Sequence, residues 1–140
     1  MASGMELPSN VKAIISDCAY TSIWATFTSE IKKRFNLPSF PILHMAQIIG
    51  VLMVGYNIKD GNVIASVSKS EVPILFIHTK PDDFIPLSMA YELYDAKIKG
   101  EKELFIVSTG GHSFAKFVDV KAYYDRIFHF TEKHISNSNL

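Results

Sequence analysis

Two short polar segments contain the residue types that general acid–base chemistry needs. Residues 78–86, His-Thr-Lys-Pro-Asp-Asp-Phe-Ile-Pro, contain the adjacent carboxylates Asp82 and Asp83, and residues 109–113, Thr-Gly-Gly-His-Ser, contain His112. A carboxylate that accepts a hydrogen bond from one imidazole nitrogen fixes the tautomer and leaves the other nitrogen free as a general base. Asp82 and His112 are therefore the first candidates for a catalytic site.

The same residue types also allow two other interpretations. Histidine and carboxylate side chains are ligands for zinc or iron, and this alternative would use His78, Asp82, Asp83 and His112. Their spacing matches no recognised metal motif, so we predict neither a metal site nor a cofactor. The second alternative is structural, because Pro-Asp-Asp and Gly-Gly-His are also ordinary turn sequences.

A nucleophile for the histidine is harder to identify. Cys18 follows an apolar run, and thiolates pair well with imidazole, but a lone cysteine is usually a small buried hydrophobic residue. Ser22 and Ser113 lie in predicted loops, where a hydroxyl more often bonds to the local backbone. We therefore predict none of the three as the nucleophile.

The elements that must position these loops follow from the apolar pattern. Short apolar runs predict strands over residues 11–17, 72–78 and 103–108. Helical patterns lie between and after these strands, over residues 23–37, 42–54, 87–99 and from about 119. Alternating strands and helices predict a parallel sheet of the α/β class. Ligands bind such sheets at the carboxyl ends of the strands, where the loops with Asp82 and His112 begin.

Two helices between the first two strands have distinct patterns. Ile23, Phe27, Ile31 and Phe35 recur every four residues opposite a charged face, which predicts an amphipathic helix. The next helix, residues 42–54, is apolar almost throughout. It is shorter than the roughly 20 residues of a membrane-spanning helix, so we interpret it as a buried or lid helix.

Three segments resemble the α/β-hydrolase superfamily. His78-x-x-x-Asp82-x-x-Ile85-Pro86 is similar to the HGxxDxxVP segment that carries the family's triad acid, and Gly111-His112 is similar to the Gly-His that carries its histidine. Residues 17–22, Asp-Cys-Ala-Tyr-Thr-Ser, resemble a segment of small bacterial esterase-like and prolyl-oligopeptidase-like members. The resemblance extends from about residue 1 to residue 135.

The resemblance implies a C-terminal portion of the α/β-hydrolase fold, with about three parallel strands flanked by helices. Residues 1–140 would form one partial domain, with a helical lid insertion over about residues 21–70. Asp82 would be the triad acid and His112 the base. Thr79 stands where the family usually has glycine, and Lys80 where a polar or acidic residue is common. The backbone at residue 79 must therefore suit a β-branched side chain.

The family's nucleophile motif, G-x-S-x-G, does not occur in this sequence, because no two of its glycines are four residues apart. Residues 1–8 instead resemble the end of the helix that follows this motif. The resemblance thus implies a C-terminal fragment of a serine hydrolase that cleaves ester or amide bonds and is inactive alone. The alternative is a short non-catalytic binding or assembly module that uses residues 24–54 as an apolar contact surface.

Composition limits the partners and the compartment. The chain has 14 basic and 14 acidic side chains, which argues against binding nucleic acid because it leaves no excess of positive charge. A single cysteine and no apparent signal peptide or membrane span predict a cytoplasmic protein. Three strands leave apolar sheet edges, so we expect pairing with the N-terminal half of the hydrolase or with another copy. The substrate in the complete protein would be a small ester or a peptide-like molecule.

Overall fold

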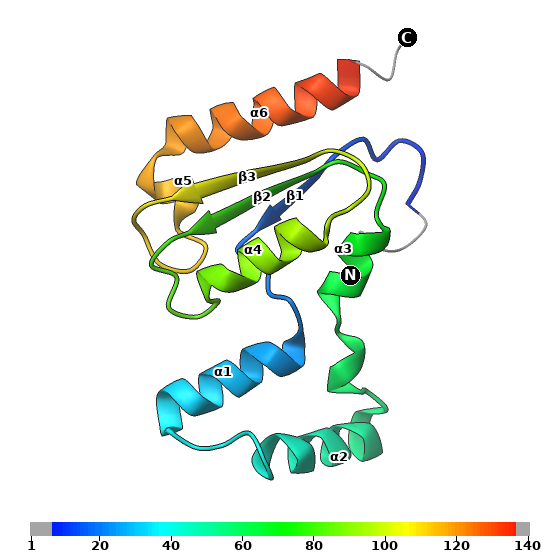
Figure 1. Ribbon diagram of the computed structural model, residues 1–140, viewed down its shortest axis with the longest axis vertical. Helices are drawn as coiled ribbons and strands as arrows, with labels where there is room; N and C mark the ends of the chain where they lie inside the picture. The colour runs from blue at the N-terminus through cyan, green and yellow to red at the C-terminus, as the bar shows by residue number, and fades with distance from the viewer. Residues whose placement is uncertain (1–6, 137–140) are drawn as a thin grey trace.

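The computed structural model describes residues 7–136, and a three-stranded parallel sheet lies between helices in one part of it (Figure 1). The strands are β1 (Ile14–Asp17), β2 (Ile74–Thr79) and β3 (Lys102–Val107), in the spatial order β1-β2-β3. In this register Ile77 lies beside both Asp17 of β1 and Phe105 of β3. The predicted α/β class with three parallel strands flanked by helices is confirmed. The helix end predicted near residues 1–8 falls almost entirely outside the described residues.

Helices cover both faces of the sheet, which explains why every residue of β2 is buried. On one face the helices are α5 (Ala115–Val118) and α6 (Val120–Ser136), and on the other they are α3 (Val63–Lys69) and α4 (Leu87–Ala96). Alternate residues of β2 point to opposite faces. The first face buries Leu75, Ile77, Val107, Ala115, Tyr123 and Phe130, and the second buries Ile74, Phe76, Val67 and Leu93.

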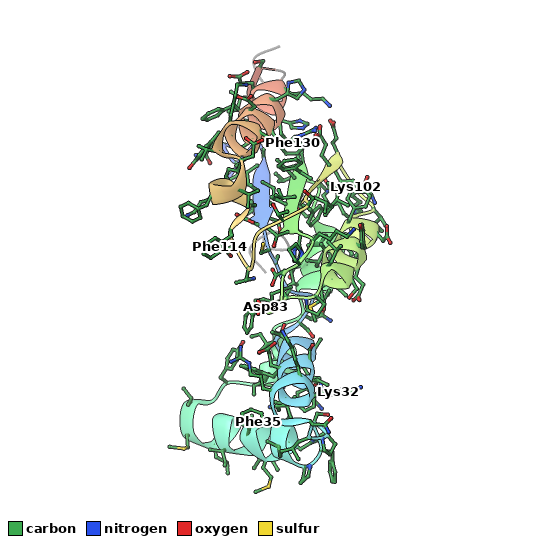
Figure 2. The ribbon with its side chains drawn as sticks, turned by 90° about the vertical axis from the view of Figure 1, so that its left-hand side faces the viewer. Lys32, Phe35, Asp83, Lys102, Phe114 and Phe130 are labelled. Carbon is green, nitrogen blue, oxygen red and sulfur yellow. The ribbon has the colours of Figure 1, made fainter. Side chains whose placement is uncertain are left out.

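Residues 21–70, which we predicted as a lid insertion, contain the helices between β1 and β2. After β1 come α1 (Ile23–Phe35), α2 (Ile42–Val54), the 3-10 helix η2 (Ile58–Asp60) and then α3. Figures 1 and 2 show α1 and α2 projecting away from the sheet and its covering helices. The bounds predicted for α2 agree with the structure, while its role as a lid stays a prediction.

The apolar side chains of α1 and α2 are mostly half-buried or exposed, so the interpretation of residues 42–54 as a buried helix is wrong. In α1 the buried residues are Thr26 and Glu30, whereas Phe27 is 45% and Phe35 67% exposed. In α2 the buried side chain is Leu43. The reason is that α1 packs against η2 rather than against the sheet, so its apolar stripe is not directed into the core. None of the helices in residues 7–136 is both long and apolar enough to cross a membrane.

Candidate active site

The loops that follow the three strands meet at the carboxyl end of the sheet, as the α/β pattern predicts. The Lys80 N–H, just after β2, donates to the Val107 carbonyl at the end of β3, at 2.8 Å. The Asp82 N–H donates to the Thr79 carbonyl at 3.2 Å, which turns the chain back towards the sheet. In the third loop Gly110 has a φ of 93°, in the left-handed region that favours glycine. This turn directs the following residues towards β2.

Asp82 and His112 are brought together by these loops. Asp82 Oδ2 lies 2.8 Å from His112 Nδ1, and the two side chains are 0% and 35% exposed. Asp82 Oδ1 accepts the backbone N–H groups of Phe84 and Ile85 at 2.9 and 2.8 Å. Burial raises the pKa of Asp82, but the hydrogen bonds from the Ile85 N–H and from His112 outweigh it, and the pKa lies below its ordinary value. An ionised Asp82 that accepts from Nδ1 leaves His112 Nε2 as the basic nitrogen.

His78, in β2, contacts the loop that contains Asp82. Its side chain is buried, and Nε2 donates to the Ile85 carbonyl at 3.0 Å. The same nitrogen lies 3.5 Å from Asp82 Oδ2. The Asp82–Ile85 turn is thus held by the Asp82 carboxylate, which accepts its N–H groups, and by His78, which donates to its last carbonyl. Asp83 is exposed, and its carbonyl accepts a hydrogen bond from Lys33 Nζ.

Thr79 fits the position where the family usually has glycine. Its φ is not positive, so the backbone at the end of β2 is open to a β-branched residue. The side chain is buried, and Oγ1 donates to the Gly111 carbonyl at 2.8 Å. Thr79 therefore links the acid strand to the loop that carries His112.

Of the three residues considered as nucleophiles, Ser22 and Cys18 have hydrogen-bond partners for their side chains, and the backbone of Ser113 lies beside Cys18. Ser22 Oγ accepts the Ala25 N–H at 3.0 Å as the N-cap of α1. Cys18 Sγ accepts the Ser113 N–H at 3.4 Å, and Ser113 itself has a φ of 58°. Burial is the main cause that raises the pKa of the Cys18 thiol to about 11, so the thiol is protonated at neutral pH. A protonated, hydrogen-bonded thiol is a poor nucleophile.

One group of side chains in the described part of the chain has the composition of a metal site. Cys18, Asp82 and His112 each offer a ligand atom, and these atoms lie within 4.8 Å of one another. Zinc accepts all three ligand types. A bound metal would have to displace the thiol proton and compete with the hydrogen bonds already made by Asp82, so the donors suit a proton-transferring pair better. The alternative metal site considered from the sequence would use His78 and Asp83 in place of Cys18. These two residues do not join the group, because His78 Nε2 donates to the Ile85 carbonyl and Asp83 is exposed.

The sequence interpretation missed one side chain at this site. The Phe84 ring contacts the His112 ring edge to face, with centroids 5.1 Å apart and an interplanar angle of 69°. The sequence gives one indication of this contact: Phe84 is an aromatic residue that lies between Asp83 and Ile85 in the loop containing Asp82. A ring placed there shields one side of the imidazole from solvent.

Comparison with known proteins gives one sequence relative and several similar structures. No family model matches the chain. It is 35% identical over 99 residues to the uncharacterised protein YqkD of Bacillus subtilis (strain 168), an alignment covering 71% of this chain and 32% of YqkD. The chain therefore spans about a third of the length of this curated relative.

Solved structures similar to the chain are α/β-hydrolases. The Pyrococcus furiosus esterase Pf2001 superposes with a TM-score of 0.66 at 15% identity, covering 95% of this chain and 48% of the esterase. The Pyrococcus horikoshii acylaminoacyl peptidase superposes with a TM-score of 0.61 at 18% identity, covering 93% of this chain and 20% of the peptidase. The described residues thus adopt a part of the α/β-hydrolase fold, as the sequence resemblance predicted.

Proposed function

We propose that this chain supplies the acid and the base of a serine hydrolase that cleaves ester or amide bonds. The observation that carries the proposal is the 2.8 Å contact between the buried carboxylate of Asp82 and Nδ1 of the partly exposed His112. In this reaction His112 Nε2 removes the proton from a serine hydroxyl, and the serine oxygen attacks the carbonyl carbon. Asp82 stabilises the imidazolium, which then protonates the leaving group. Water cleaves the acyl-enzyme by the same steps.

We place the nucleophilic serine and the oxyanion hole outside these 140 residues. The sequence contains no G-x-S-x-G, Ser22 caps a helix, and Cys18 holds its thiol proton. The partner is then the N-terminal part of the same hydrolase, carried on a longer polypeptide or on a separate one, with self-association as the alternative. A cytoplasmic location suits the single free cysteine, Cys18. A binding module would give no reason for the ionised Asp82 beside His112.

A fluorophosphonate probe, which reacts with activated serines, tests this proposal. The isolated chain should not be labelled, whereas the complete protein read from the surrounding gene should be labelled at a serine outside residues 1–140. In the complete protein, His112→Ala should lower kcat for p-nitrophenyl acetate by at least about 10³-fold. Labelling within residues 1–140, or full hydrolysis by His112→Ala, would contradict the proposal.

A further inference from the structure

An apolar pocket lies beside the Asp82–His112 pair. It has a volume of about 260 Å³ and is lined by Tyr20, Ile23, Thr26, Phe27 and Phe84. Tyr20 comes from the loop after β1, and Phe84 comes from the loop after β2. The other three residues come from the first turns of α1, which lies next to the loop containing Asp83 in Figure 2. The pocket is therefore formed between the projecting helix and the candidate active site.

Phe84 connects this pocket to the base. The Phe84 ring lines the pocket and also contacts the His112 ring, and the centroids of the two rings are 5.1 Å apart. Its position is set by the acid, because the Phe84 N–H donates to Asp82 Oδ1 at 2.9 Å. A group bound in the pocket would thus lie one aromatic ring away from the imidazole that we assign as the base.

The opposite wall of the pocket is held in place by several contacts of α1. The Ile23 N–H donates to the Gly61 carbonyl at 3.3 Å, and a Cβ added at Gly61 would lie 2.6 Å from Ile23 Cδ1. Lys33 Nζ donates to the Asp83 carbonyl, which joins α1 to the acid loop. The apolar residues Ile23 and Phe27, which do not enter the core, are therefore held facing the site.

The lining determines what the pocket can bind. None of the lining side chains is charged, and Thr26 Oγ1 already donates to the Ser22 carbonyl at 3.0 Å. A charged group would lose hydration there, with only the hydroxyls of Tyr20 and Thr26 as possible hydrogen-bond partners, whereas an apolar group would gain from leaving water. An engineered cavity of about 150 Å³ binds benzene, so the larger volume here admits a ring with a few methylene groups.

We propose that this pocket binds an uncharged apolar group of the substrate, about the size of a phenylpropyl chain. The proposal rests on the proposed hydrolase function and names its substrate class: esters or amides with such a group on the acyl or the leaving side. Tyr20, Phe27 and Phe84 contribute aromatic rings to the lining, and Ile23, which lies against Gly61, contributes an aliphatic side chain.

Binding to the 140-residue chain can be measured without catalysis. Toluene should shift the Ile23 methyl and Phe84 ring signals in NMR spectra and saturate them, whereas 1-methylpyridinium, of the same shape but charged, should bind at least about tenfold more weakly. Phe27→Ser should weaken toluene binding several-fold. Phe35→Ser is the matched control, because Phe35 lies on the same helix, is 67% exposed and does not line the pocket.

Several binding results would overturn the proposal: no saturable shift at Ile23 and Phe84, equal effects of the two serine variants, or tighter binding of the cation. The last result would indicate an aromatic cage for cations instead. Each of these results stands regardless of whether the complete protein hydrolyses esters.

Hydrolysis by the complete protein tests the substrate class. The kcat/KM ratio of p-nitrophenyl 3-phenylpropanoate to p-nitrophenyl acetate reports an apolar group on the acyl side. The ratio of 3-phenylpropyl acetate to ethyl acetate reports one on the leaving side. Phe27→Ser should lower one of these ratios several-fold, and Phe35→Ser should lower neither. If toluene binds but His112→Ala leaves hydrolysis intact, the proposed function fails and the substrate assignment fails with it.

Discussion

Asp82 uses its two carboxylate oxygens for two separate purposes. Oδ1 accepts two backbone N–H groups and so fixes the acid loop, whereas Oδ2 accepts from His112. Both interactions favour the ionised form, which is why the pKa is lowered although burial alone would raise it. The structural and the proposed chemical role of this carboxylate therefore depend on the same charge.

Asp82→Asn should lower the free energy of unfolding by about 2 kcal/mol at pH 7, because hydrogen bonds to a charged acceptor are lost or weakened. A carboxyl group whose pKa is lower in the folded state stabilises the fold above its unfolded pKa of about 3.9. That stability is lost as the pH falls through the folded pKa. Urea unfolding at pH 7, 5 and 3 should therefore show the difference between wild type and variant shrinking below about pH 4, and a constant difference would contradict this account.

Thr79→Val should lower the free energy of unfolding by about 1 kcal/mol, because it removes the hydrogen bond from Oγ1 to the Gly111 carbonyl while preserving the shape of the side chain. Thr79→Ser keeps the hydroxyl and serves as the control. Thermal unfolding measures the loss, and the NMR line width of His112 reports whether its loop has become more mobile. Equal stability of the valine variant and the wild type would show that the bond contributes nothing.

At the level of elements, caps and long-range hydrogen bonds position the helices around the site. Ser22 is the N-cap of α1, and it pairs with Asn62, the N-cap of α3, in an isolated β-bridge. On the other side of the sheet, the hydroxyl of Tyr123 in α6 donates to Asp17 Oδ2 at the end of β1, at 2.9 Å. Both contacts lie close to where β1 meets the site loops.

Ser22→Ala should lower the free energy of unfolding by about 1 kcal/mol, the usual cost of removing an N-cap side chain. Ser22→Asp should retain most of the stability, because a carboxylate also accepts the Ala25 N–H. Ser88→Ala, at an exposed serine in the first turn of α4, is the matched control and should change stability by less than about 0.5 kcal/mol. Chemical denaturation of the three variants measures this, and an unaffected Ser22→Ala would refute the cap.

Tyr123 should ionise above the ordinary pKa of a tyrosine. Burial, followed by the hydrogen bond to Asp17, raises its pKa to about 12, so absorbance at 295 nm should show one tyrosine ionising late. Because the folded pKa exceeds the unfolded value of about 10, the neutral phenol stabilises the fold below pH 10, and this stability is lost as the pH rises towards 12. Tyr123→Phe should remove the late step; its persistence would assign the step to another tyrosine.

At the scale of the whole molecule, two apolar features face outward. The α2 helix exposes Leu52, Met53 and Val54 by 78–80%, and β1 and β3 are the edge strands of the sheet. A helix that is apolar on all sides is normally buried within a protein. These surfaces are where we expect the N-terminal part of the proposed hydrolase, or a second copy, to pack.

The isolated chain should self-associate at concentrations of about 10–100 μM, because apolar surface of this extent favours leaving water. Light scattering after size-exclusion chromatography measures the mass. Leu52→Lys with Met53→Lys should shift the chain towards the 15.7 kDa monomer, whereas Glu92→Lys with Asp95→Lys on α4 should not. A monomer at all concentrations would contradict the expectation.

The sequence by itself determined the features that local patterns encode. Apolar runs and helical periods predicted all three strands and the bounds of α2, and the order of strands and loops predicted that the segments with Asp82 and His112 share one end of the sheet. Such patterns suffice because each strand or helix follows from neighbouring residues, and parallel strands align their carboxyl ends. The catalytic roles of the two residues stay a prediction until hydrolysis is measured.

Only the tertiary structure decided how distant segments face one another. The periodicity of α1 correctly predicted a helix, but not that Ile23 and Phe27 would line a pocket with Phe84 instead of entering the core. Likewise, nothing in the local sequence indicates that Thr79 bonds to Gly111, since 32 residues separate them. Periodicity defines which residues share a face, whereas the partner of that face depends on how the whole chain packs.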